Sequence, residues 1–316
     1  MILPMGSRAA HLLLLAALLV LPGCGAATPA ASGRPAVVAA LYPLAFLAEG
    51  VGGDEIEVVN LGAGAGDPHD LELTPRQVRT IREAALVVHM GRRFQPGVEA
   101  VTEQMPQERI FQVLSLPEVA SELRRVEPED GHEGQEKGSE GDDHALDYDP
   151  HVWLDPILTQ EVVRALGAKL SAVDRENAEE HTRGAEELAG RLGQLDQRFR
   201  EGLADCARRE IVTSHSAFGY LAARYGLTEV GITGLSPEAE ASPRRMAEVA
   251  SFARQRAVET IFFEKTVSPR IAESLAREVG VSTDVLDPIE VEPDSGDYFG
   301  AMETNLQSLR KALECK

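Results

Sequence analysis

Short apolar segments alternate with stretches that carry helix signals, first between residues 36 and 113 and again between residues 211 and 313. We expect strands at 36–41, 56–61, 86–90, 110–113, 211–213, 229–232, 260–263 and 283–286. We expect helices between them at 44–50, 74–83, 96–104, 216–225, 243–255 and 269–279, with a last helix at 298–313. Such alternation indicates βα units and parallel sheets, so the predicted fold class is α/β.

The region between these two halves carries helical periodicity instead. One stretch runs from residue 157 to about 169, and a longer one, capped by Asp174, runs to about 204. In the longer stretch apolar residues recur at three- and four-residue steps and form one helix face: Leu188, Leu192, Leu195 and Phe199. We therefore predict two βα domains, at 36–156 and 209–316, joined by one long rigid helix within a connecting region at 157–208.

The N-terminus has the features of a secretory signal. Arg8 is the only formally charged residue before Cys24, and an apolar run from Leu12 to Leu21 follows it. This run is too short for a membrane span. It ends in Leu-Pro-Gly before Cys24, which resembles a bacterial lipoprotein signal. We expect a lipoprotein signal peptide at 1–23, lipid on Cys24 and a flexible tether at 24–35; the alternative is an ordinary signal peptide cut a few residues later.

The net charge is −20, which argues against nucleic acid as a partner because phosphate binding needs clustered Lys and Arg. Much of this charge lies in residues 126–149, which hold ten carboxylates and one lysine. A segment with so little to bury is expected to be a disordered acidic loop. It contains His132 and His144, so it is either a solvated spacer or an auxiliary metal-collecting loop.

Two further cysteines, Cys206 and Cys315, lie in the second half. In an oxidising compartment they would form one disulfide that holds the C-terminal helix, and otherwise they are two separate buried thiols. Neither belongs to a C-x-x-C pair, so a thiolate zinc site is unsupported.

Candidate metal ligands follow the ends of predicted strands. His69 lies in the loop after the second strand, His215 follows strand 211–213, and Asp287 follows the strand that ends at Leu286. His151 lies between two Asp-Pro steps, which favour an extended backbone. In open α/β sheets, ligands bind outside the carboxyl ends of the strands, so our hypothesis is one metal ion between the two domains.

Three imidazoles and one carboxylate suit zinc, whereas manganese prefers more carboxylate oxygen. Copper also accepts imidazole and stays open. Because imidazole binds metal in its neutral form, we expect the affinity to fall below about pH 6.5. Of the other histidines, His89 is expected to cap the first sheet or to support a ligand. His181 is expected to be solvated.

Five motifs extend this pattern over the chain from about Ala36 to its end. They are Gly66-Asp-Pro-His-Asp-Leu-Glu-Leu-Thr-Pro75, Asp149-Pro-His-Val-Trp-Leu-Asp-Pro156, Thr213-Ser-His-Ser-Ala-Phe-Gly-Tyr-Leu-Ala-Ala-Arg-Tyr-Gly226, Leu235-Ser-Pro-Glu-Ala-Glu-Ala-Ser-Pro243 and Leu286-Asp-Pro288. In these motifs the chain resembles the cluster A-I metal-binding lipoproteins of ABC importers, the ZnuA/TroA type.

The resemblance implies the TroA-like solute-binding fold, with His69, His151, His215 and Asp287 as the ligands. Members that take up manganese usually carry a carboxylate where His215 stands, so it implies zinc, with manganese as the alternative. It also implies an extracytoplasmic protein that is anchored through Cys24 to the bacterial cell membrane. Its partner would be an ABC-type metal permease, and we expect a monomer that is not an enzyme.

Three other classes of protein compete with this interpretation. A secreted zinc hydrolase keeps one metal position open for water beside a general base, for which Glu264 is a conceivable candidate. However, four protein ligands leave no open position, and the sequence has no His-Glu-x-x-His. An adhesin or surface scaffold would use the fold without metal. The third alternative is a receptor for an organic solute, and the low aromatic content with a single Trp argues against stacking on a sugar.

Overall fold

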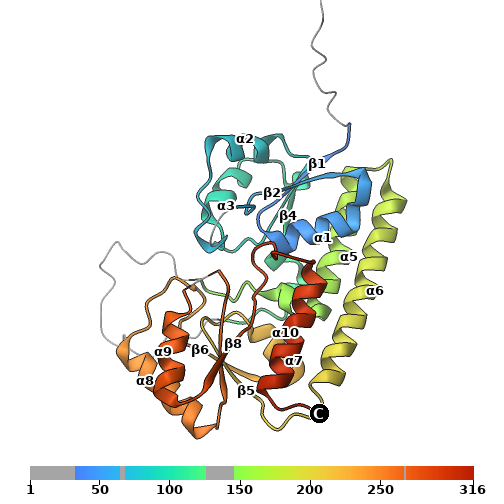
Figure 1. Ribbon diagram of the computed structural model, residues 1–316. Helices are drawn as coiled ribbons and strands as arrows, with labels where there is room; N and C mark the ends of the chain where they lie inside the picture. The colour runs from blue at the N-terminus through green and yellow to red at the C-terminus, as the bar shows by residue number, and fades with distance from the viewer. Residues whose placement is uncertain (1–32, 65–67, 126–145, 267) are drawn as a thin grey trace, which may run out of the picture. The chain divides into compact units, whose positions relative to one another are not determined.

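The computed structural model describes residues 33–64, 68–125, 146–266 and 268–316. Residues 34–316 form one compact unit that contains two four-stranded sheets. The first sheet has the order β2-β1-β3-β4 and the second β6-β5-β7-β8, and every neighbouring pair of strands is parallel. The predicted α/β class with two parallel sheets is confirmed (Figure 1).

The eight predicted strands are present, each within about a residue or two of its expected ends. They are β1 (Ala36–Ala39), β2 (Glu57–Asn60), β3 (Leu86–His89), β4 (Ile110–Gln112), β5 (Glu210–Thr213), β6 (Thr228–Gly231), β7 (Thr260–Phe263) and β8 (Ser282–Val285). Strand β3, one of the two central strands of the first sheet, is fully buried. Apolar runs such as Leu-Val-Val suit this position, because helices cover both faces of a parallel sheet.

The helices of the first half are α1 (Tyr42–Gly52), α2 (Pro75–Glu83), α3 (Pro96–Thr102) and a short α4 (Pro117–Ala120) that the sequence pattern did not predict. Those of the second half are α7 (Gly219–Tyr225), α8 (Pro243–Gln255), α9 (Arg270–Val279) and α10 (Tyr298–Ala312). Helix α2 starts as expected, because Thr74 forms a capping box with Gln77 and Pro75 occupies the first turn.

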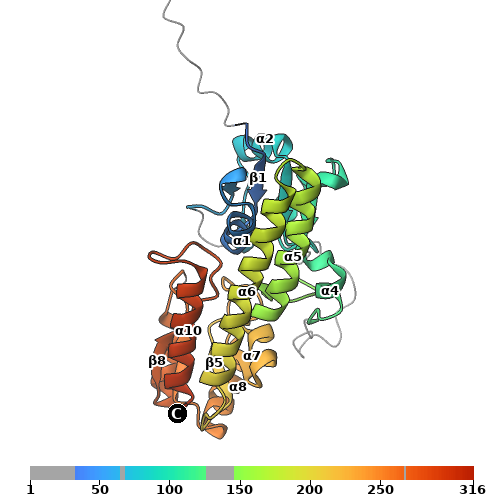
Figure 2. The same cartoon turned by 90° about the vertical axis from the view of Figure 1, so that its right-hand side faces the viewer.

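Two helices connect the halves, α5 (Pro156–Val173) and α6 (Ala178–Gly202), which pack side by side (Figures 1 and 2). Helix α6 contacts α1 of the first half and α10 of the second. Gly184 permits this close approach, because a Cβ there would overlap the carbonyl oxygen of Val51 in α1. The connector is thus one long helix braced by a second, rather than a single rod.

Asp174 and His181 differ from the sequence prediction. Asp174 ends α5 instead of capping α6, which begins after Asn177. The Asp174 carboxylate accepts hydrogen bonds from Asn177 Nδ2 and His181 Nε2, both at 3.0 Å. His181 is therefore fully buried, and the expectation that it is solvated is wrong, because an aspartate seven residues earlier supplies its polar partner.

Cys206 and Cys315 form a disulfide that ties the segment after α6 to the C-terminus. Among the described residues, no helix has the length and apolar character that a membrane crossing requires. The predicted signal peptide, Cys24, most of the tether, and His132 and His144 of the acidic loop lie outside the described residues.

Candidate metal centre

Three histidines and one glutamate bring their side-chain ends together: His69, His151, His215 and Glu290. One ligand atom from each lies within 4.8 Å of all the others. One oxygen of Glu290 lies 3.1 Å from His69 Nε2, 3.0 Å from His151 Nε2 and 3.7 Å from His215 Nε2. The Nε2 atoms of His151 and His215 are 3.4 Å apart. The side chains of all four residues are almost completely buried, with exposed fractions of 6% or less.

These separations fit the donor atoms of a zinc ion. A tetrahedral site with bonds of about 2.0–2.1 Å has donor atoms about 3.3 Å apart. The three separations from Glu290 and the one between His151 and His215 run from 3.0 to 3.7 Å, and His69 Nε2 lies within 4.8 Å of the other two histidines. Three imidazole nitrogens and one carboxylate oxygen also match the ligand types that zinc accepts. The four side chains can therefore enclose one tetrahedral ion after small adjustments.

The four side chains come from connections that follow strands or precede a short turn. His69 lies in η2 (Pro68–Asp70), in the connection after β2. His215 comes two residues after β5, one of the two central strands of the second sheet. His151 directly precedes the 3₁₀ turn η5 (Val152–Leu154), and Glu290 follows β8. Carboxyl ends of strands in both sheets thus supply the site, as expected for parallel α/β sheets.

Two carboxylates behind the site orient the imidazoles. Asp149 Oδ1 lies 2.8 Å from His151 Nδ1, and Glu264 Oε1 lies 2.6 Å from His215 Nδ1. Each carboxylate accepts the Nδ1–H and so turns Nε2 toward the other ligands. Such carboxylate–histidine pairs fix the tautomer and raise the basicity of a metal-binding imidazole.

The same contacts set the protonation of the metal-free site. Burial lowers the pKa of His151, but its hydrogen bonds with Asp149 and Glu290 outweigh burial and raise the pKa to about 9. At His215, bonds with Glu264 and Glu290 likewise outweigh burial and raise the pKa to about 10. Burial raises the pKa of Glu290, yet the histidines hold it well below its ordinary range. Glu290 is thus an anion that the histidines neutralise, and a divalent cation can take over that task once the protons leave.

The structure brings together the three predicted histidines but not the predicted aspartate. The Asp287 carboxylate accepts the backbone N–H of Ile289 at 2.8 Å, and Asp287 is not in the group of ligand atoms. Glu290, which the sequence analysis missed, contributes the carboxylate oxygen of the group instead. The signal available was weak: Glu290 and Glu292 both follow the Asp-Pro step, and nothing in the pattern ranks them.

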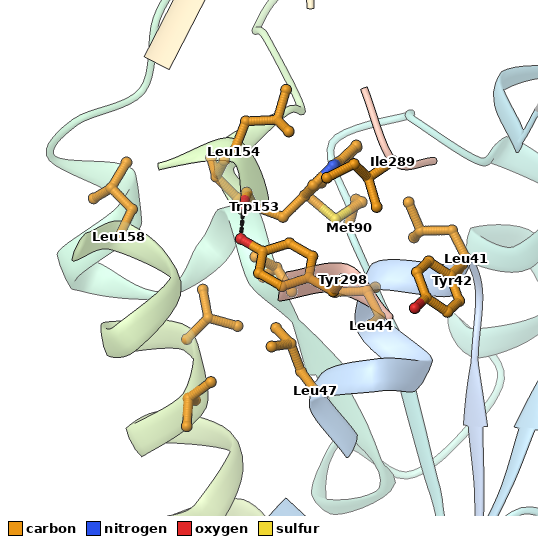
Figure 3. Close-up of a cluster of buried hydrophobic side chains, with 14 of the residues drawn as sticks. Leu41, Tyr42, Leu44, Leu47, Met90, Trp153, Leu154, Leu158, Ile289 and Tyr298 are labelled. Carbon is orange, nitrogen blue, oxygen red and sulfur yellow. Dashed lines mark hydrogen bonds between the residues drawn. The ribbon is translucent and has the colours of Figure 1, made fainter. Parts of the chain in front are cut away.

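Trp153 connects the two segments that carry His151 and Glu290. Its ring lies 5.2 Å from the His151 ring, and its Nε1–H donates to the carbonyl oxygen of Pro288 at 2.8 Å. Tyr298 at the start of α10 donates its hydroxyl to the Trp153 carbonyl oxygen, within a cluster that includes Met90 and Ile289 (Figure 3). Packing of this kind holds side chains from distant parts of the sequence in one arrangement.

Of the remaining candidates, His89 is fully buried in β3, and neither of its ring nitrogens has a hydrogen-bond partner among the described residues. Glu264, considered as a general base, instead orients His215.

Comparison with known families identifies matching proteins over nearly the whole described chain. The sequence model of the family described as "ZnuA: Zinc-uptake complex component A periplasmic" matches residues 37–312. The chain is 32% identical to the "High-affinity zinc uptake system protein ZnuA" of Bacillus subtilis, over 89% of this chain and 88% of that protein. It is also 32% identical to the "Zinc-binding protein AdcA" of Streptococcus pyogenes serotype M3, over 89% of this chain. It covers 56% of AdcA, so the chain spans about half the length of these streptococcal relatives.

Solved structures show the same fold. The laminin-binding protein Lmb of Streptococcus agalactiae, described as bifunctional "with adhesin and metal transporting activity", has a TM-score of 0.76 and 27% identity. The match covers 88% of this chain and 99% of Lmb. The AdcAII protein of Streptococcus pneumoniae has a TM-score of 0.75 and 28% identity, with 89% of this chain and 99% of AdcAII covered.

Proposed function

The chain belongs to the ZnuA family of periplasmic zinc-uptake components, and we propose that it captures a zinc ion outside the cytoplasm and delivers it to an ABC-type importer. The observation that carries this proposal is the buried group of His69, His151, His215 and Glu290, whose donor atoms all lie within 4.8 Å of one another and are of the types that zinc accepts. We propose these four residues as the ligands. Manganese is a less suitable cargo, because three of the four donors are imidazole nitrogens.

The protein acts as a binding protein and not as an enzyme. A hydrolytic zinc site needs an open position for water and a base aimed at it. Here four side chains converge, and Glu264, the nearby carboxylate considered as a base, is engaged by His215 Nδ1 and by the Ser214 hydroxyl. A closed ligand set of this kind favours capture of the ion over catalysis.

The location and partner follow from the family and from the N-terminal motif. A lipid on Cys24 would anchor the protein to the outer face of the bacterial cell membrane, with residues 24–35 as the tether. The partner would be the membrane permease of a zinc ABC importer. Release of the ion then requires the permease to separate the ligands that the two halves contribute, and a monomer is sufficient for this cycle.

Zinc titration of the metal-free protein tests the proposal. We expect one zinc ion to bind per chain. Elemental analysis gives the stoichiometry, and the fluorescence of Trp153, the single Trp of the chain, reports binding during the titration. Glu290→Gln should bind zinc more weakly. Glu292→Gln is the matched control, because Glu292 is an exposed carboxylate two residues away. Absence of zinc binding in the folded wild type, or equal effects of the two substitutions, would contradict the proposal.

Adhesion is a second candidate function, because the chain shares its fold and 27% sequence identity with Lmb, a protein described as having both adhesin and metal transporting activity. Binding of the purified zinc-loaded protein to immobilised laminin tests it. Saturable binding would support an adhesive role, and a signal equal to that of an albumin-coated surface would exclude it.

A further inference from the structure

Ile289, the residue before Glu290, has an unusual backbone conformation. Its φ is +59°, in the left-handed region, and its side chain is fully buried. A β-branched residue rarely adopts this conformation, because its side chain crowds the backbone. The other described non-glycine residues with positive φ are Arg92, Arg93, Ala257 and Glu314, none of which is β-branched. Surrounding contacts must therefore hold Ile289 in place.

Asp287 holds the backbone of Ile289 through its side chain. Its Oδ1 accepts the N–H of Ile289 at 2.8 Å, a side-chain bond to the backbone two residues later that forms an Asx turn. Asn305 of α10, which is 1% exposed, fixes Asp287 itself. Asn305 Oδ1 accepts the N–H of Asp287 at 2.9 Å, and Asn305 Nδ2 donates to the Asp287 carbonyl oxygen at 2.6 Å. The backbone of Asp287 is therefore held on both sides, and the turn begins from this fixed residue.

Trp153 holds the residue between them. Its Nε1–H donates to the Pro288 carbonyl oxygen at 2.8 Å, and its ring lies in the same apolar cluster as Ile289 (Figure 3). Four backbone polar groups between Asp287 and Ile289 thus have defined partners: the N–H and carbonyl of Asp287, the carbonyl of Pro288 and the N–H of Ile289. The direction in which the chain leaves Ile289 decides where the Glu290 carboxylate lies.

We infer that Asp287 is a positioning residue for zinc binding: its Asx turn holds Ile289 in the left-handed conformation and so directs Glu290 at the three histidines. Asp287 acts through Glu290 and does not touch the ion. Without the turn, Ile289 relaxes to negative φ, and the Glu290 carboxylate leaves the group. This inference rests on the proposed function and deepens it, because it assigns the residue that prepares the carboxylate ligand.

A set of substitutions separates positioning from direct ligation. Zinc affinity is measured by competition with a chromophoric chelator. Asp287→Ala should weaken zinc binding at least tenfold, whereas Asp287→Asn, whose amide oxygen accepts the same N–H, should stay within about threefold of wild type. In a Glu290→Ala background, Asp287→Ala should add less than a threefold loss, because the residue it positions is gone.

Other outcomes overturn the inference. If Asp287→Asn and Asp287→Ala weaken binding equally and both effects add to that of Glu290→Ala, Asp287 is itself a ligand. If Asp287→Ala leaves the affinity unchanged, the turn is dispensable, although the proposed function stands. If the folded wild type binds no zinc, the proposed function and this inference fail together. Should Asp287→Ala not fold, Asp287→Ser replaces it, because a hydroxyl forms the same turn more weakly; its affinity should lie between those of Asp287→Asn and Glu290→Ala, and wild-type affinity would overturn the inference.

Discussion

Replacement of His89 by leucine should make the protein more resistant to acid. His89 is fully buried in β3, its ring nitrogens have no hydrogen-bond partner among the described residues, and burial lowers its pKa from 6.5 to about 4. The folded protein therefore keeps His89 neutral at a pH where the unfolded chain takes up a proton. Because the folded-state pKa lies below the unfolded value, the free energy of unfolding falls as the pH drops from 6.5 toward 4.

The size of this effect follows from the shift. Each pKa unit corresponds to about 1.4 kcal/mol, so the loss due to His89 reaches about 2 kcal/mol at pH 5 and about 3 kcal/mol at pH 4. Urea unfolding of the metal-free protein, followed by circular dichroism at pH 7, 6 and 5, measures it. The difference in unfolding free energy between His89→Leu and wild type should grow by about 2 kcal/mol between pH 7 and pH 5.

Met90→Leu is the control, because Met90 is the next residue, is equally buried and does not titrate. Its difference from wild type should be the same at every pH. Parallel curves for His89→Leu and wild type would refute the reasoning, because they would mean that His89 takes up its proton in the folded state as easily as in the unfolded chain.

Three further predictions follow from the fold. Reduction of the Cys206–Cys315 disulfide, or replacement of both cysteines by serine, opens a loop with a sequence separation of 109 residues. Chain entropy predicts that the free energy of unfolding in urea falls by up to about 4.7 kcal/mol while the zinc affinity stays unchanged. Equal unfolding midpoints would contradict this. Gly184→Ala should destabilise the protein by about 1–3 kcal/mol through overpacking against Val51, whereas Gly190→Ala, at a glycine with open space around it, should not destabilise it. Because α6 contacts both α1 and α10, small-angle scattering should give nearly the same radius of gyration with and without zinc, and a large decrease on zinc addition would argue against a rigid connector.

Local sequence signals were sufficient for most of the fold. Runs such as Leu86-Val87-Val88 are apolar on both faces, which suits parallel strands covered by helices, and Gly or Pro residues mark many of the element ends. Thr74-Pro75 predicts the start of α2 to within one residue. Helix α4 (Pro117–Ala120) was not predicted, because an element of four residues is too short to show a helical hydrophobic period.

Only part of the candidate site could be predicted from the sequence, and the reason is physical. His69, His151 and His215 follow strand ends or lie between Asp-Pro steps, so local chemistry points to them. Glu290 depends on a left-handed isoleucine that Asp287 holds through a local turn, and Asn305 and Trp153 support this turn from other parts of the fold. His181 is similar, because its burial depends on Asp174 across a helix connection. Positions set by tertiary contacts leave no pattern in the neighbouring sequence.

Anomalous diffraction from crystals of the zinc-loaded protein tests the central claim most directly. We predict one strong zinc peak, bonded at about 2.0–2.2 Å to one atom each of His69, His151, His215 and Glu290. A peak bonded to Asp287 instead of Glu290, or a zinc ion bound elsewhere while these four side chains keep their contacts with one another, would contradict the account.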